Sequence, residues 1–119
     1  MLIVILIPSA TKPVEELFPA NVVVYNTGRV LWVPATKMTL TCDVTNYKTG
    51  SECKAKFGSW TKDDAHIDVY TPHDVMDLTN FVSPTFTVLS SKAKRVLTNY
   101  ACCPEGYSSI LFTFNFRKK

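Results

Sequence analysis

Four cysteines, and the tyrosines beside two of them, are the residues with the most distinctive chemistry in this 119-residue chain. Cys102 and Cys103 are adjacent, and Tyr100 and Tyr107 lie on either side of them. Cys42 and Cys53 enclose a polar stretch. Four cysteines allow three pairings, and the residues alone leave all three open.

The adjacent cysteines suggest a functional role if they are bonded to each other. Neighbouring Cα atoms lie about 3.8 Å apart, below the usual disulfide range, so the bond would close a strained ring. Strain of this kind gathers at functional sites. A bridge across the Cys42 to Cys53 loop is geometrically easy and would stabilise the fold by about 3 kcal/mol. The alternative is a zinc site with His66 and His73, but neither CxxC nor HxxxH spacing is present.

Aromatic residues around the cysteine pair suggest a binding site for a cation. A stiffened tip would hold Tyr100 and Tyr107 as two fixed walls, and Trp60, at the end of another predicted strand, could supply a third. Each ring attracts a cation by roughly 0.5 to 2 kcal/mol, and quaternary ammonium is the usual ligand. Taken singly, each ring is more often a packing residue. The group as a whole predicts ligand binding without turnover.

Catalytic and nucleotide-binding motifs are missing from the sequence. The four glycines are isolated, so no phosphate-cradling loop can be written, and HExxH and GxSxG are absent. Asp63, Asp64 and His66 lie close together, but a solvated turn explains them. A net charge of +3, with its only basic run at residues 117–119, is too small for a chain whose main partner is a phosphate backbone. We therefore expect neither an enzyme nor a cofactor, a bound metal or a nucleic acid partner.

Period-two alternation of apolar residues predicts an all-β domain. A hairpin over 22–33 would turn near Gly28. Further strands are predicted over 38–42, 53–57, 67–69, 86–88, 94–100 and 110–116. Residues 11–19, with two prolines, indicate a connecting loop, and 74–78 could form one helical turn. Short strands separated by turns are typical of a β-sandwich.

The N-terminal residues 1–7 are uniformly apolar, which favours a buried strand over a minimal signal peptide. No apolar run reaches the roughly 20 residues of a membrane span, so none is expected. We divide the chain into a lead-in over 1–19, holding this strand and the prolines, and a domain over 20–119.

Several motifs in order resemble the ligand-binding domain of the Cys-loop (nicotinic) receptors, and most closely the soluble acetylcholine-binding proteins of molluscan type. They cover the run from about Val22 to Lys119. The matching pieces are GxVLxxP at 28–34, the CD…C loop at 42–53, KFGSWT at 56–61, YxCCPExY at 100–107 and NFRKK at 115–119. The cysteine pair with its tyrosines is the most specific of these.

The resemblance implies an immunoglobulin-like β-sandwich that forms a pentamer or decamer with ligand sites between neighbouring subunits. It implies a principal face of Trp60, Tyr100, Cys102, Cys103 and Tyr107. It implies a complementary face with Leu31 and Val33, and Val23 as a less certain third residue. It makes Cys42–Cys53 the structural disulfide of the family. The ligand would be acetylcholine, a nicotine-like molecule or another cationic amine.

The polar, proline-free disulfide loop and the end of the chain at Lys119 favour a soluble, secreted binding protein over a receptor. The family's N-terminal helix and first strands have no counterpart in the motifs, and Ile7 stands where a site tyrosine is expected. An aromatic box that lacks the aromatic residues of these segments would bind its cationic ligand roughly tenfold to a thousandfold more weakly. The alternative is a secreted structural protein that self-assembles through its exposed edges and has lost ligand binding.

Overall fold

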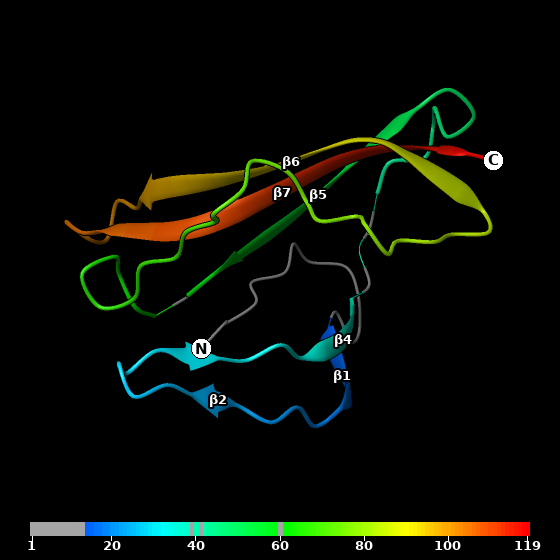
Figure 1. Cartoon of the computed structure of the whole chain (residues 1–119). Coiled ribbons are helices and arrows are strands. Elements are labelled where there is room, and N and C mark those ends of the chain that lie inside the picture. The colour runs from blue at the N-terminus through cyan, green and yellow to red at the C-terminus, as the bar shows by residue number, and fades with distance from the viewer. Residues whose placement is uncertain (1–13, 39, 41, 60) are drawn as a thin grey trace.

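A computed structural model describes residues 14–38, 40, 42–59 and 61–119, and within these ranges it contains seven strands and no helix. The largest unit is an antiparallel sheet in the order β5-β7-β6. Its strands are β5 (Ser51–Gly58), β6 (Phe86–Asn99) and β7 (Gly106–Lys118). Figure 1 shows β7 between its two neighbours along their length. The predicted all-β class is confirmed.

One face of this sheet forms the core. Alternate residues of the three strands point to this face, and the buried apolar residues among them are Cys53, Ala55, Phe57, Ala93, Ile110 and Phe116. Phe57 packs edge-on against Phe112, with ring centroids 5.4 Å apart. The predicted alternation over 110–116 therefore describes β7 correctly. Burying these side chains stabilises the sheet by roughly 1.5 to 3 kcal/mol for each large one.

The disulfide loop closes one end of the sheet. Cys42 and Cys53 are bonded, with Cα atoms 5.1 Å apart. Within the loop, the Thr45 N–H and hydroxyl both donate to the Asp43 carboxylate, which lowers the pKa of Asp43. The Lys118 N–H donates to the Tyr47 carbonyl at 2.7 Å, so the loop is joined to the end of β7.

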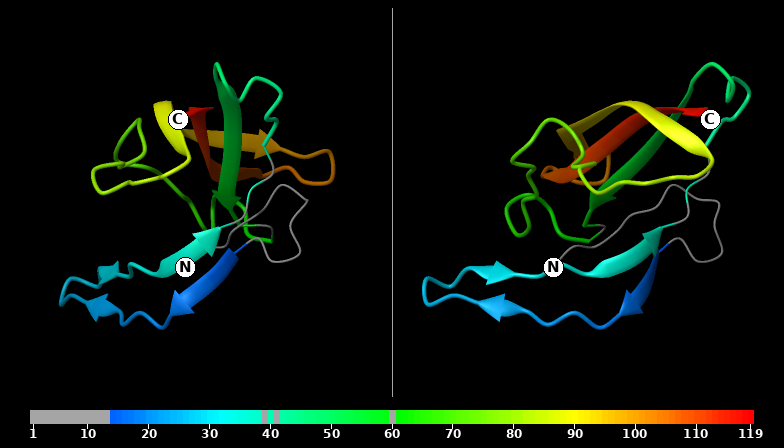
Figure 2. Two further views of the ribbon diagram at one scale, coloured as in Figure 1. Left: turned by 90° about the vertical axis from the view of Figure 1, so that its right-hand side faces the viewer. Right: turned by 45° about the vertical axis from the view of Figure 1, so that its right-hand side comes forward.

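Residues 14–38 form a separate arm that contains two short, two-stranded antiparallel sheets. Its strands are β1 (Val14–Phe18), β2 (Val23–Val24), β3 (Val30–Leu31) and β4 (Ala35–Met38). β1 pairs with β4 and β2 with β3, and Gly28 has φ +88° at the turn, as the predicted hairpin requires. Figure 2 shows the arm beside the sheet as its own ribbon. No Cα atom of these four strands lies within 8 Å of β5, β6 or β7.

Several predicted local structures were wrong. The predicted connecting loop at 11–19 contains β1, because Val14 to Phe18 pairs with β4 despite the flanking prolines. Residues 67–69 form no strand and 74–78 no helical turn; both belong to the irregular connection that follows β5. The strand predicted over 38–42 overlaps β4 only at Met38; Leu40 and Cys42 belong to no strand, and residues 39 and 41 lie outside the described residues. The two short strands expected between 86 and 100 are one strand with a bulge between Val88 and Ser90.

The close approach of β5 and β7 at Gly58 leaves no room for a side chain. A Cβ atom there would lie 2.8 Å from the Ser108 carbonyl oxygen and 3.0 Å from the Ser109 Cβ. We expect Gly58→Ala to lower the free energy of unfolding by about 1 to 2 kcal/mol, because backbone would have to move. Urea unfolding measures this change. The control is Glu52→Ala on the same strand, which removes only an exposed 3.4 Å ion pair with Lys54; equal losses for both variants would contradict the packing argument.

Candidate functional site

The turn between β6 and β7 brings two tyrosine rings together. Asn99 lies opposite Gly106 in the ladder, and the Cys103 N–H donates to the Tyr100 carbonyl at 3.1 Å across the turn. The centroids of the Tyr100 and Tyr107 rings are 5.5 Å apart, with ring planes at 73°. Tyr100 is 50% exposed, so part of its ring surface is open to a ligand.

The adjacent cysteines in this turn are bonded to each other. All four cysteines are therefore in disulfides, and none is left to bind a metal. The zinc alternative built on them fails for that reason. The bonded pair precedes Gly106 at the start of β7, whereas Cys53 lies opposite Phe114, roughly 26 Å further along the strand at 3.3 Å per residue. Only the adjacent pair is near the tyrosines.

A small pocket of about 40 Å³ lies at the base of the two rings. Besides Tyr100 and Tyr107, it is lined by Lys56, Ser59, Ser108 and Ser109. The three serines are buried. The Ser59 hydroxyl accepts the Lys62 N–H at 3.0 Å, and the Ser108 hydroxyl accepts the Val69 N–H at 3.0 Å. Among the described residues that line it, Lys56 is the only charged one.

Sequence reasoning did not single out these four lining residues. Two of them belong to the KFGSWT motif, and two follow Tyr107 directly. The signal that could have found them is strand pairing, because Lys56 lies opposite Leu111 and Gly58 opposite Ser109 in the ladder. The residues around the end of β5 must then lie beside those that follow Tyr107.

The connection from 61 to 85 is held to the sheet by polar contacts. The Arg95 guanidinium donates to the Asp68 carboxylate at 2.6 and 3.1 Å and to the Val69 carbonyl at 3.1 Å. These bonds lower the pKa of Asp68. Asp63 and His66 share a turn, with Oδ1 and Nδ1 2.7 Å apart, and this bond lowers the pKa of Asp63. The geometry around Asp63 and His66 is therefore that of a capped turn.

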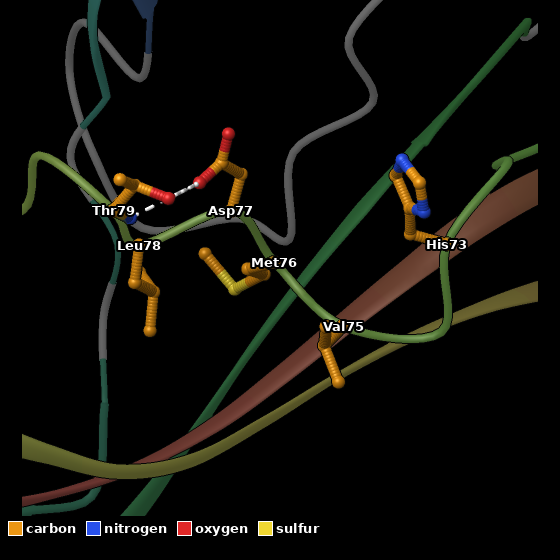
Figure 3. A pocket seen from close by; sticks show the side chains of 6 residues that line it. All are labelled: His73, Val75, Met76, Asp77, Leu78 and Thr79. Carbon is orange, nitrogen blue, oxygen red and sulfur yellow. Dashed lines mark hydrogen bonds between the residues drawn. The ribbon is translucent and has the colours of Figure 1, made fainter.

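A larger hollow of about 320 Å³ lies within the same connection. The described residues that line it come from one short segment: His73, Val75, Met76, Asp77, Leu78 and Thr79. Figure 3 shows Asp77 and Thr79 joined by hydrogen bonds, and the Thr79 N–H and hydroxyl both donate to the Asp77 carboxylate. Because these described residues belong to one loop and include no Trp, Tyr or Phe ring, this hollow does not match the predicted aromatic site.

The remaining predicted site residues lie elsewhere. Trp60 and Ile7 lie outside the residues that the structure describes. Leu31 and Val33 lie on the arm, 39% and 72% exposed, and Val23 pairs directly with Leu31. Since β3 does not approach β7, one chain does not bring Leu31 to Tyr107.

The combination of a three-stranded sheet, a disulfide loop at one end and a cysteine pair between tyrosines at the other matches a known family. Residues 4–119 match the neurotransmitter-gated ion-channel ligand binding domain. The chain belongs to this family. The match begins before residue 22, where the motifs alone had placed its start.

Solved and curated relatives agree with this assignment. The acetylcholine-binding protein of Bulinus truncatus is similar in structure, with a TM-score of 0.72 and 31% identity over 92% of this chain and 60% of that protein. An acetylcholine receptor subunit of Caenorhabditis elegans, alpha-type acr-16, is 29% identical over 98% of this chain and 24% of its own length. The neuronal subunit alpha-4 of Gallus gallus is 34% identical over 76% of this chain and 15% of its own.

This chain therefore spans about a quarter or less of the curated relatives that it matches. The sheets described above are part of the β-sandwich of the family. Among the described residues, none belongs to a helix that could cross a membrane.

Proposed function

We propose that this chain binds acetylcholine-like cations through an aromatic site at the contact between two copies. Tyr100, Tyr107 and the Cys102–Cys103 pair supply the principal face, together with Trp60. Leu31 and Val33 of a neighbouring copy supply the complementary face. The observation that carries this proposal is the pair of tyrosine rings 5.5 Å apart beside the bonded cysteines.

The chemistry of the site suits an onium group. Two tyrosine faces attract a cation through their quadrupoles, and the disulfide restricts the turn that carries Tyr100. No covalent or redox step is needed, so the proposed role is binding without turnover. Two disulfides favour an oxidising compartment, and we propose that the chain is secreted.

A second copy is required because the two faces are separate within one chain. The arm carries a row of exposed apolar side chains, with Phe18 61%, Val24 71% and Val33 72% exposed. Exposed apolar surface of this extent is typical of an interaction site. A head-to-tail contact, arm to tyrosine turn, can close into a ring such as the pentamer that we propose.

Lys56 is expected to weaken the binding of a simple cation. It lines the tyrosine pocket, and no carboxylate is among the pocket residues. We expect Lys56→Gln to tighten acetylcholine binding by about three- to tenfold at low salt, since two like charges about 6 Å apart repel by roughly 1 to 3 kcal/mol. Calorimetric titration at two salt concentrations measures the gain, which should shrink at 0.5 M NaCl. A gain independent of salt, or none, would argue against a bound cation near Lys56.

The direct test compares acetylcholine with its uncharged carbon isostere, 3,3-dimethylbutyl acetate, by tryptophan fluorescence and calorimetry. The two ligands share their shape, so the difference in affinity reports the charge. We expect saturable binding of acetylcholine at millimolar concentration or below, and at least roughly tenfold weaker binding of the isostere. Equal affinities, or no binding to the folded and oxidised chain, would contradict the proposal.

An alternative function is self-assembly without ligand binding. The exposed apolar arm favours it, because the same surface would hold copies together whether or not the tyrosine site is occupied. This alternative predicts a stable oligomer by light scattering and no response to acetylcholine in the titration above.

A further inference from the structure

The face of the three-stranded sheet opposite the apolar core is strongly basic. It carries two lysines on each edge strand, namely Lys54, Lys56, Lys92 and Lys94. Thr113 of β7 pairs with the first lysine of each edge strand, and Leu111 pairs with the second. Since side chains alternate along a strand, all four lysines project from the same side, which we call the basic face.

The four charges are close enough to act together. Strands lie about 4.8 Å apart, so the two lysine rows are separated by roughly 10 Å, and neighbours within a row by about 7 Å. These separations are about one Debye length at physiological salt. Arg117 continues the same side of β7. Among the strand residues on this side, Glu52 is the single carboxylate, and it forms an ion pair with Lys54, with Oε1 and Nζ 3.4 Å apart.

The described elements leave the basic face open. The 61–85 connection is joined to β6 and β7 by side-chain hydrogen bonds. The sheet residues that make these bonds are Ser91, Arg95 and Ser108, and all three project from the core side. The arm strands approach none of the sheet strands. Lys54, Lys92 and Lys94 are accordingly exposed to solvent.

We propose that the basic face binds a sulfated polysaccharide. Two lysine rows match the charges of a linear polyanion laid along β7, and the Thr113 hydroxyl between the two rows can bond to its oxygens. The two disulfides favour an oxidising compartment, where sulfated glycans rather than nucleic acids are the polyanions available. Sequence composition did not suggest this surface, because its lysines are scattered along the chain and only the sheet register assembles them.

A matched pair of triple variants tests this surface. Lys54→Gln, Lys92→Gln and Lys94→Gln remove three charges from the basic face and spare Lys56, which lines the tyrosine pocket. Lys48→Gln, Lys62→Gln and Lys118→Gln remove three exposed charges elsewhere. Both variants have the same net charge, so a difference between them reports position. The probe is a heparin dodecasaccharide, measured by calorimetry in 50 and 150 mM NaCl.

We expect the face variant to bind heparin at least about tenfold more weakly than the natural chain, and the control variant to lose no more than about twofold. Equal losses in the two variants, or no heparin binding by the natural chain at 50 mM NaCl, would overturn the proposal. Duplex DNA of equal charge bound as tightly as heparin would overturn the assignment to a sulfated glycan.

The lysines also lie on edge strands, where charge opposes aggregation. If the triple variant aggregates, the single variant Lys92→Glu replaces it in the test, because it keeps a charge on the edge strand. Lys92→Glu should weaken heparin binding measurably while remaining monodisperse. Acetylcholine affinity of each variant at 150 mM NaCl should stay within about threefold of that of the natural chain, because salt screens these more distant charges. The glycan proposal and the cation proposal can therefore fail independently.

Discussion

Replacing Tyr107 by alanine should weaken acetylcholine binding by roughly tenfold or more. The substitution removes one aromatic wall and leaves the Tyr100 ring without the neighbour it now packs against at 5.5 Å. A desolvated ring contributes about 2 kcal/mol to cation binding, and an exposed one about half that. Calorimetric titration of the oxidised chain measures the change.

Two matched variants separate this effect from general damage to the sheet. Tyr107→Phe keeps the ring and should bind acetylcholine within about threefold of the natural chain, because the attraction comes from the ring face. Tyr70→Ala removes a tyrosine that is 77% exposed in the 61–85 connection and should change nothing. If Tyr107→Phe lost as much as Tyr107→Ala, the hydroxyl rather than the ring would carry the binding.

The two disulfides should affect different properties: the Cys42–Cys53 bridge the stability of the fold, and the Cys102–Cys103 bridge the affinity for ligand. Replacing Cys42 and Cys53 together by alanine should lower the free energy of unfolding by about 3 kcal/mol, because the bridge restricts the unfolded chain by joining residues that are 11 positions apart in sequence. Cys53 is 2% exposed in the core, so alanine is preferred over serine to avoid burying a hydroxyl. Urea unfolding in oxidising buffer gives the change.

The matched comparison is the double alanine variant of Cys102 and Cys103. Their sequence separation is one, so the bridge restricts almost none of the unfolded chain and its removal should leave the unfolding free energy nearly unchanged. Acetylcholine affinity should fall, because the turn that carries Tyr100 loses its restriction. A stability loss as large as that of the first pair, with unchanged affinity, would invert the roles that we assign to the two bridges.

Much of the sheet could be predicted because its sequence alternates strictly. Ile110 to Phe116 alternate between the core and the opposite face, and β5 does the same with its lysines. The part of the arm over 22–33 was predicted as a hairpin because Gly28 suits the left-handed turn position, and its φ is positive in the structure. These signals are local, so a short window of sequence contains them.

The errors arose where long-range contacts decide the structure. Val14 to Phe18 form β1 only because β4, more than fifteen residues away, pairs with them. Ile67 and Val69 alternate with polar residues as a strand would. However, the backbone of Val69 bonds to the side chains of Arg95 and Ser108 instead of to a neighbouring strand, so no ladder forms. Lys56 and the pocket serines were missed for the same reason, since pairing between β5 and β7 brings them to the tyrosines.

The most direct test of a cation site shared between copies is a complementation titration. One chain carries Tyr107→Ala, and the other carries Leu31→Lys and Val33→Lys, both at exposed positions of the arm, where the added positive charges repel a cation. Each variant alone should bind acetylcholine weakly, because every site contains one damaged face. Co-expressed chains should recover a fraction of high-affinity sites, where an intact tyrosine turn meets an intact arm. A mixture that binds no more tightly than its two parents would contradict the shared site.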